Sequence, residues 1–234
     1  MAKEEKSEMT FLEHLEELRW HIIRSILAIT IAFAMAFIFR EFIFDNIILA
    51  PKNPEFITNK FFCELAAKWK TESLCINQKP MQLINITMAG QFNTHMKISL
   101  VLGLILAFPY IFYEFWKFVA PALYPKERKV ARGTVFATAF LFLLGVVFGY
   151  FILIPLSVHF LNNYIVSEQV INQINLMSYI STISMLALAS GITFELPILM
   201  YFLTKIGIIT PSFLRKYRRH AIIVIFIISA IITP

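Results

Sequence analysis

The chain has 234 residues, of which 58% are hydrophobic and 15% are charged. Its apolar residues gather into runs of roughly 20, the length that crosses a bilayer as a helix, and this excludes an ordinary soluble domain. The formal net charge of +6 does not indicate nucleic-acid binding, because the basic residues lie at the edges of the apolar runs, where they set topology and meet anionic lipid. The sequence therefore predicts an all-α polytopic membrane protein.

The N-terminal residues 1–21 predict an amphipathic cytoplasmic helix that continues into the first membrane span. Thr10 and Glu13 make a capping-box pattern, and apolar residues then recur at helical spacing. Glu13 and Glu17 lie four residues apart on one face, where like charges repel mildly, so the pair favours contact with water or a cation. A cleaved signal peptide is not expected, since residues 1–24 hold six Glu against four Lys or Arg and lack a basic start.

Five spans are predicted within a single membrane domain covering residues 1–234. They lie near residues 22–39, 94–116, 132–156, 179–204 and 220–234. The last apolar run, 221–232, would be only about 18 Å long as a helix, which is short of a hydrocarbon core of about 30 Å. Either this helix thins the bilayer locally or the chain stops early, and the closing Thr233-Pro234 favours early termination.

The Lys and Arg residues predict the orientation. Residues 1–24 hold four of them, 117–132 hold five and 205–219 hold five, whereas the loop at 157–178 holds none. Because short basic segments stay in the cytoplasm, the N-terminus is expected to be cytoplasmic.

The loop at 41–93 is predicted to be an extracytoplasmic cap rather than a second domain. It contains one helical pattern, at 56–69, whose apolar stripe is Phe61, Phe62, Leu65 and Trp69. Cys63 and Cys75, the two cysteines of the chain, both lie in this loop. An oxidising compartment would permit a disulfide between them, and two unpaired thiols are the alternative.

Several features indicate how the spans pack. Pro109, Pro155 and Pro197 fall within or near the ends of spans, where a proline removes a backbone hydrogen bond and kinks the helix. Kinked spans favour a bent, concave assembly. Gly145 and Gly149 form a small-xxx-small pattern that allows close helix approach, which we interpret as packing within the chain.

Motifs of enzyme chemistry are missing from the sequence. It contains no glycine-rich phosphate loop, no His-Glu-x-x-His pair and no Gly-x-Ser-x-Gly elbow. The five histidines are dispersed and do not have metal-ligand spacing. Neither an enzyme nor a metal or other cofactor is expected.

Acidic residues are scarce in the membrane part of the chain. Those after Ser73 are Glu114, Glu127, Glu168 and Glu195. A charge near the middle of a bilayer costs at least ~3 kcal/mol, so an acid in an apolar helix usually faces protein or a water-filled cavity. Glu195 is the clearest case: either it is an internal acid hydrogen-bonded by Thr193 or Ser190, or it docks a partner. Glu168 is expected to be ordinary surface.

Glu127 is the acid of a turn that Pro121 and Pro125 stiffen. It is either a solvated loop charge neutralised by Lys126 and Arg128, or an acceptor for an incoming guanidinium, which pairs with carboxylates in bidentate geometry.

Five short motifs follow one another along the chain. They are His14-Leu15-Glu16-Glu17-Leu18-Arg19, Ala50-Pro51, Phe118-Val119-Ala120-Pro121-Ala122-Leu123-Tyr124 with Glu127-Arg128, Phe194-Glu195-Leu196-Pro197, and Ile232-Thr233-Pro234. Each motif alone is weak. In this order and with this topology, they resemble the TatC family, the signal-receptor subunits of the twin-arginine protein translocase.

The resemblance implies six spans in a concave, glove-like bundle in the bacterial inner membrane. It also implies binding of twin-arginine signal peptides at the cytoplasmic face and transport of folded proteins driven by proton motive force. By position, Glu17 and Glu127 resemble the acids that receive the arginine pair, with Arg19 and Phe118 beside them. Glu114 resembles a further polar position of this site.

The implied partners, besides signal peptides and the lipid bilayer, are single-span TatA and TatB type subunits and further copies of this chain within the complex. Glu195 and Thr233 resemble the positions at which the single-span subunits dock. Two features depart from the family: the sixth span is missing, and the loop at 41–93 is longer.

Two other classes of function fit the sequence less well. A proton-coupled small-solute transporter would use Glu195 to carry a proton or bind a cation, but the internal repeats common in such transporters are not found. A purely structural membrane scaffold does not explain Glu17 and Glu127 beside the points where the chain enters the membrane.

Overall fold

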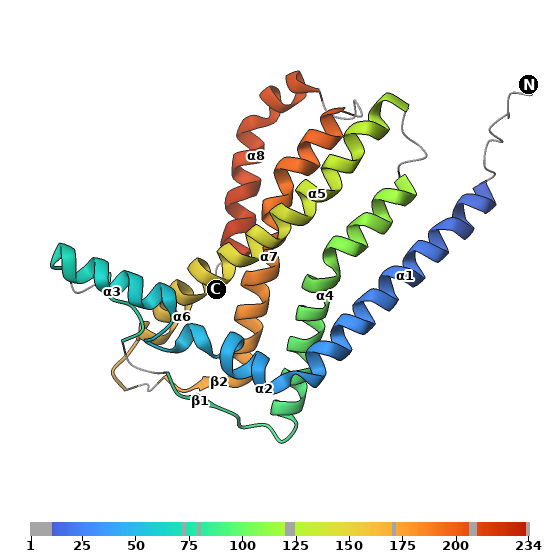
Figure 1. Ribbon diagram of the computed structural model, residues 1–234. Coiled ribbons are helices and arrows are strands. Elements are labelled where there is room, and N and C mark those ends of the chain that lie inside the picture. Colours follow the sequence, from blue (N-terminus) through green and yellow to red (C-terminus); the bar gives the residue numbers. More distant parts are fainter. Residues whose placement is uncertain are drawn as a thin grey trace, which may run out of the picture.

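The structure is a computed structural model that describes residues 11–71, 74–78, 81–119, 125–169, 172–205 and 210–232. Long helices dominate it, so the prediction of an all-α polytopic membrane protein is confirmed (Figure 1). The helices are α1 (Phe11–Ile38), α2 (Arg40–Phe42), α3 (Ile57–Trp69), α4 (Gly90–Val119), α5 (Pro125–Phe148), α6 (Ile154–Asn163), α7 (Leu176–Lys205) and α8 (Pro211–Ile232).

Four helical stretches in the described chain are long and apolar enough to cross a membrane. They are His14–Ile38, Gly90–Val119, Gly133–Asn163 and Leu176–Thr204. α8 is a helix but is not one of the four. The third stretch extends seven residues beyond the predicted end at 156, because α6 continues the path of α5 to Asn163.

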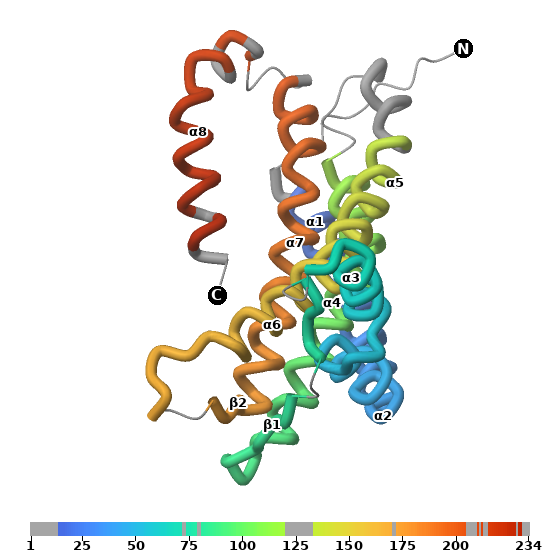
Figure 2. The backbone as a smooth tube through the Cα atoms, turned by 90° about the vertical axis from the view of Figure 1, so that its left-hand side faces the viewer, coloured from blue at the N-terminus to red at the C-terminus, as the bar shows by residue number. Residues whose placement is uncertain are grey.

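Two helix pairs organise the bundle. α1 packs along α4, α5 packs along α7, and α4 contacts both α5 and α7. α8 contacts α7, and Figure 2 shows it standing apart from the other helices. The end where α1 begins and α4 and α7 end is called the N-terminal end below, and the opposite end, with α2 and both strands, the cap end.

The connection between α1 and α4 builds the cap end. After α2 come a π-helical turn at Ile43–Ile48, a 3-10 turn at Ala50–Lys52 and then α3, which realises the helical pattern predicted at 56–69. The short strand β1 (Leu83–Ile84) pairs in parallel with β2 (Ile174–Asn175), with Leu83 opposite Ile174. This pairing joins the loop before α4 to the loop before α7.

Tyrosines fasten the π-helical turn to the bundle. The Tyr150 hydroxyl donates to the Ile47 carbonyl at 2.7 Å, and the Tyr179 hydroxyl donates to the Ile48 carbonyl at 3.0 Å. The buried apolar cluster lies around this junction, and its least exposed members include Ile98, Ile154 and Ile180. The best-packed part of the chain is therefore at the cap end.

A second π-helical turn, at Gly149–Leu153, separates α5 from α6. Pro155 follows it, and a proline offers no N–H to the carbonyl four residues earlier, which here belongs to Phe151. The Thr58 hydroxyl, from the first turn of α3, donates to that carbonyl at 2.5 Å. A side chain of the loop thus replaces the hydrogen bond that the proline removes.

Asn59 of α3 is fully buried and organises the cap through its amide group. Its Nδ2 donates to the carbonyls of Pro51, at 3.1 Å, and Asn53, at 2.7 Å. Its Oδ1 accepts from Asn77 Nδ2 at 3.2 Å, and the same Asn77 nitrogen donates to the Pro155 carbonyl at 3.1 Å. Cys63 and Cys75 are joined in a disulfide in the structure, which ties α3 to this network.

Glycines form the contact between α5 and α7. A Cβ atom added at Gly145 would lie 2.7 Å from the Ser190 carbonyl oxygen, and one added at Gly149 would lie 2.9 Å from the Ser190 Cβ. Side chains at these positions would push the helices apart, so the interpretation of Gly145 and Gly149 as packing residues within the chain is confirmed.

Candidate functional site

One face of α1 carries polar residues at the N-terminal end. His14, Glu17, His21 and Arg24 are spaced by three or four residues, which aligns them along the helix. This face meets α4, where Glu114 and Phe118 lie four residues apart. The most extensive helix contact of the described chain, between α1 and α4, therefore ends in a polar cluster.

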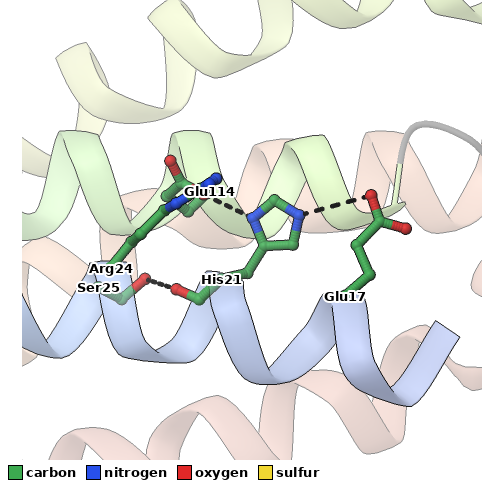
Figure 3. Close-up of polar contacts among 5 residues, drawn as sticks. All are labelled: Glu17, His21, Arg24, Ser25 and Glu114. Atoms are coloured by element: carbon green, nitrogen blue, oxygen red, sulfur yellow. Dashed lines mark hydrogen bonds and ion pairs between the residues drawn. The ribbon is translucent and has the colours of Figure 1, made fainter. Parts of the chain in front are cut away.

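His21 and Glu114 form the centre of this cluster, and both are buried. The His21 Nδ1 donates to Glu114 Oε2 at 2.5 Å, and the Arg24 guanidinium lies 3.8 Å from the same oxygen (Figure 3). The charge of the Glu114 carboxylate is therefore balanced within the protein, since a buried carboxylate without such partners would be strongly destabilising.

Glu17 is the accessible acid of the cluster. Its Oε1 lies 3.9 Å from His21 Nε2, and its side chain is 36% exposed, against 4% for Glu114. The two carboxylates thus approach opposite nitrogens of one imidazole ring (Figure 3). Glu114 fixes the ring, and Glu17 presents the oxygen atoms that a cationic ligand could reach.

Phe118 covers the histidines of this cluster. Its ring stacks on His14, with centroids 4.4 Å apart, and meets His21 edge-on, with centroids 6.1 Å apart. Water is thereby kept from one side of the imidazole of His21, which strengthens its interactions with the two acids.

The other predicted residues of the signal-peptide site are not all brought together. Arg19 lies two residues from Glu17, on a different side of α1, and its guanidinium lies 5.9 Å from the centre of the Trp20 ring. Glu127 falls in the first turn of α5, but its side chain lies outside the described part of the structure.

Glu195, in α7, is half-buried, and its Oε1 atom is buried without a hydrogen-bond partner in the part of the chain that the structure describes. The predicted partners are wrong: Ser190 donates to the Gly145 carbonyl at 2.7 Å, and Thr193 donates to the Ala189 carbonyl of its own helix at 2.7 Å. Both hydroxyls satisfy backbone carbonyls instead. Thr138 of α5 lies beside the acid, and its buried Oγ1 also has no partner within hydrogen-bonding geometry. Thr233, the other predicted docking residue, lies outside the described residues.

His21 and Arg24 were not among the residues predicted for the site. The signal was present in their spacing from Glu17, which places all three on one face of a helix. No three His, Cys, Asp or Glu side chains among the described residues are arranged to hold a metal ion.

Known proteins are similar to this chain over nearly its whole length. The family model described as "Sec-independent protein translocase protein (TatC)" matches residues 13–234. A protein of this name from Blattabacterium is 44% identical over 234 residues, covering 99% of this chain and 88% of the relative. Its namesake from Aquifex aeolicus is 34% identical, covering 97% of this chain and 85% of the relative.

Solved structures agree with this result. A crystal structure of the twin-arginine translocase receptor TatC in DDM is similar with a TM-score of 0.73 and 34% sequence identity, over 95% of this chain and 89% of that chain. The family resemblance in the motifs is therefore confirmed. This multi-pass membrane chain belongs to the TatC family of Sec-independent protein translocase proteins.

Proposed function

We propose that this chain is the receptor subunit of a twin-arginine translocation complex in the bacterial inner membrane. It binds twin-arginine signal peptides at the cytoplasmic face, where its N-terminus lies. It then recruits single-span TatA and TatB type subunits, and the assembly moves folded proteins across the membrane using proton motive force.

The observation that carries this proposal is the exposed carboxylate of Glu17 beside the buried His21–Glu114 pair. A guanidinium approaching Glu17 would meet a carboxylate whose neighbours are already fixed, so little ordering is needed on binding. Charge-assisted hydrogen bonds at a partly desolvated site are strong, and Arg fits a carboxylate better than Lys does because it binds in two-point geometry.

The two acids of the cluster have different roles in this proposal. Glu17 contacts the first arginine, whereas Glu114 positions His21 and does not itself contact the peptide. Glu127 at the start of α5 is the acceptor for the second arginine, as its match to the family motif suggests.

Photocross-linking in membranes tests the receptor role. The peptide carries a photoreactive group next to either Arg-Arg or Lys-Lys, and its yield of cross-links to this chain is measured. With Arg-Arg we expect a loss of about tenfold or more in affinity for Glu17→Gln and for Glu127→Gln, since one charge-assisted hydrogen bond contributes about 1.5–3 kcal/mol.

Glu16→Gln is the matched control, because Glu16 is the exposed neighbour of Glu17 on a different side of α1. It should leave the cross-link unchanged. Equal cross-linking of the Arg-Arg and Lys-Lys peptides, or equal losses for Glu16→Gln and Glu17→Gln, would overturn the proposal.

Partner recruitment is assigned to Glu195, whose Oε1 lacks a hydrogen-bond partner among the described residues. A polar side chain of a single-span subunit can supply that hydrogen bond. We expect Glu195→Gln to reduce cross-links to TatA and TatB type subunits while the chain stays folded. Thr193→Val, on the same helix, should not reduce them, because the Thr193 hydroxyl bonds its own helix. Unchanged cross-links in Glu195→Gln would contradict the assignment.

A further inference from the structure

Helix α3 has three different faces along its length. Asn59 and Ala66 are buried against the protein. The second face is an apolar stripe with a spacing of four residues, called the α3 stripe: Ile57, Phe61, Leu65 and Trp69. The third face carries Lys60, Glu64 and Lys68, also four residues apart and all exposed.

The α3 stripe has no cover within the described chain, apart from the half-buried Leu65. Ile57 is 71% exposed, Phe61 is 59% exposed and Trp69 is 63% exposed. The apolar stripe predicted for α3 included Phe62, but Phe62 is partly buried while Phe61 and Trp69 are exposed. Large apolar side chains on one side of a helix, beside a charged side, indicate a surface that another apolar phase covers.

The stripe is held in a fixed position. The Phe56 ring, just before α3, stacks on Phe151 with centroids 5.6 Å apart, and Thr58 bonds the Phe151 carbonyl. Asn59 fastens the first turn, and the Cys63–Cys75 disulfide fastens the middle. The exposed side chains therefore cannot fold back onto the bundle.

The level at which α3 leaves the bundle is close to the one expected for a membrane boundary. Figure 1 shows α3 projecting sideways, across the direction of the long helices, and in Figure 2 the same helix points toward the viewer. It docks at Phe151, which lies about 27 Å along the helical path from Gly133, the start of the third span. A hydrocarbon core of about 30 Å that begins near Gly133 would end close to this level.

We propose that α3 is an in-plane membrane helix, with the α3 stripe inserted at the boundary between phospholipid headgroups and acyl chains. Lys60, Glu64 and Lys68 then face water and the phosphate groups. Trp69, at the C-terminal end of the helix, sits where indole rings are enriched, since one part of the ring is apolar and its N–H is polar. Each of the three faces of α3 then contacts a different medium: protein, lipid or water.

Spin labelling in vesicles of phosphatidylethanolamine and phosphatidylglycerol tests this inference. Single cysteines are introduced as Phe61→Cys and Glu64→Cys, and the native cysteines are not labelled because they are paired. Collisions of each label with oxygen, which dissolves in lipid, are compared with collisions with a water-soluble nickel complex. We expect the oxygen-to-nickel ratio to be several-fold higher at position 61 than at position 64.

Equal ratios at the two positions would overturn the proposal, as would a label at position 61 that neither reagent reaches, since that result indicates a protein partner on the stripe. Quenching of tryptophan fluorescence by brominated lipid gives an independent readout. Trp20 is also exposed, so the test is made in a Trp20→Phe background. There, Trp69→Phe should remove much of the quenching, because the remaining Trp116 is buried. No change in quenching in this variant would contradict insertion. Both tests are independent of the proposed receptor role, since α3 lies far from Glu17.

Discussion

Glu114 and Glu195 are both acids within apolar helices, yet their surroundings differ. Glu114 lies between α1 and α4 and has His21 and Arg24 on one of its oxygens. Glu195 lies where α7 packs on α5 through glycines, and its Oε1 has no hydrogen-bond partner. The α1–α4 pair satisfies its acid from within, whereas the α5–α7 pair leaves one oxygen of its acid without a partner among the described residues. Of the two acids, Glu195 is therefore the one that could accept a further hydrogen bond from another chain.

The largest effect is expected from His21→Leu. This change leaves the buried carboxylate of Glu114 without its closest partner, and breaking a buried pair in this way is expected to lower the free energy of unfolding by about 3 kcal/mol. Thermal unfolding in detergent measures the loss. The double variant His21→Leu with Glu114→Leu should recover part of it, because the unpaired charge is gone. A double variant less stable than His21→Leu alone would show that the unpaired charge of Glu114 is not the main cause of the loss in stability.

The next effect concerns the α5–α7 contact. Gly145→Val places a side chain where an added Cβ lies 2.7 Å from the Ser190 carbonyl, so we expect a loss of about 2 kcal/mol from overpacking. Gly133→Val is the matched control on the same helix, since nothing lies within 4 Å of a Cβ atom there. Equal unfolding temperatures for the two variants would contradict the close approach of α5 and α7.

Glu195→Leu tests the comparison of the two acids directly. Because Oε1 lacks a partner, replacing Glu195 by an apolar residue of similar size should leave the isolated chain as stable as before or stabilise it by about 1 kcal/mol. Unfolding in detergent without partner subunits is the measurement. A loss as large as that of His21→Leu would mean that the chain satisfies both acids internally.

The smallest effect is expected from Thr138→Val. The Thr138 hydroxyl is buried without a hydrogen-bond partner, so its replacement by a methyl group should change the free energy of unfolding by less than about 0.5 kcal/mol. A loss near 1 kcal/mol, the contribution of an ordinary hydrogen bond, would instead indicate that Thr138 bonds Glu195 in the membrane. Unfolding of Thr138→Val alone and combined with Glu195→Leu separates the two outcomes.

The sequence predicted much of the fold because apolar length and Lys and Arg positions are local signals. The stretch predicted at 94–116 lies inside α4, and the pattern at 56–69 appears as α3. The π-helical turns and the pairing of β1 with β2 were not predicted, because they depend on contacts between segments far apart in the chain. Tyr150 and Ile47, for example, are 103 residues apart.

The candidate site was predicted only in part, because it also depends on contacts between segments far apart in the chain. Glu17 and Phe118 were predicted from the motifs and Glu114 from its position in the family, and the three meet in the structure around His21. The hydroxyl partners expected for Glu195 were wrong, because Ser190 and Thr193 can reach backbone carbonyls, and a sequence does not show which acceptor a hydroxyl will choose.

The π-helical turn at Gly149–Leu153 also sets the rotational phase of the third span. Such a turn accommodates one residue more than an α-helical turn does, and one residue rotates everything beyond it by about 100°. Gly145 therefore faces α7, while Pro155 and His159, further along the same path, face Asn77 of the cap. Deleting a single residue within the turn would keep both halves helical, but it would turn α6 away from the loop and release α3 from its place beside the bundle.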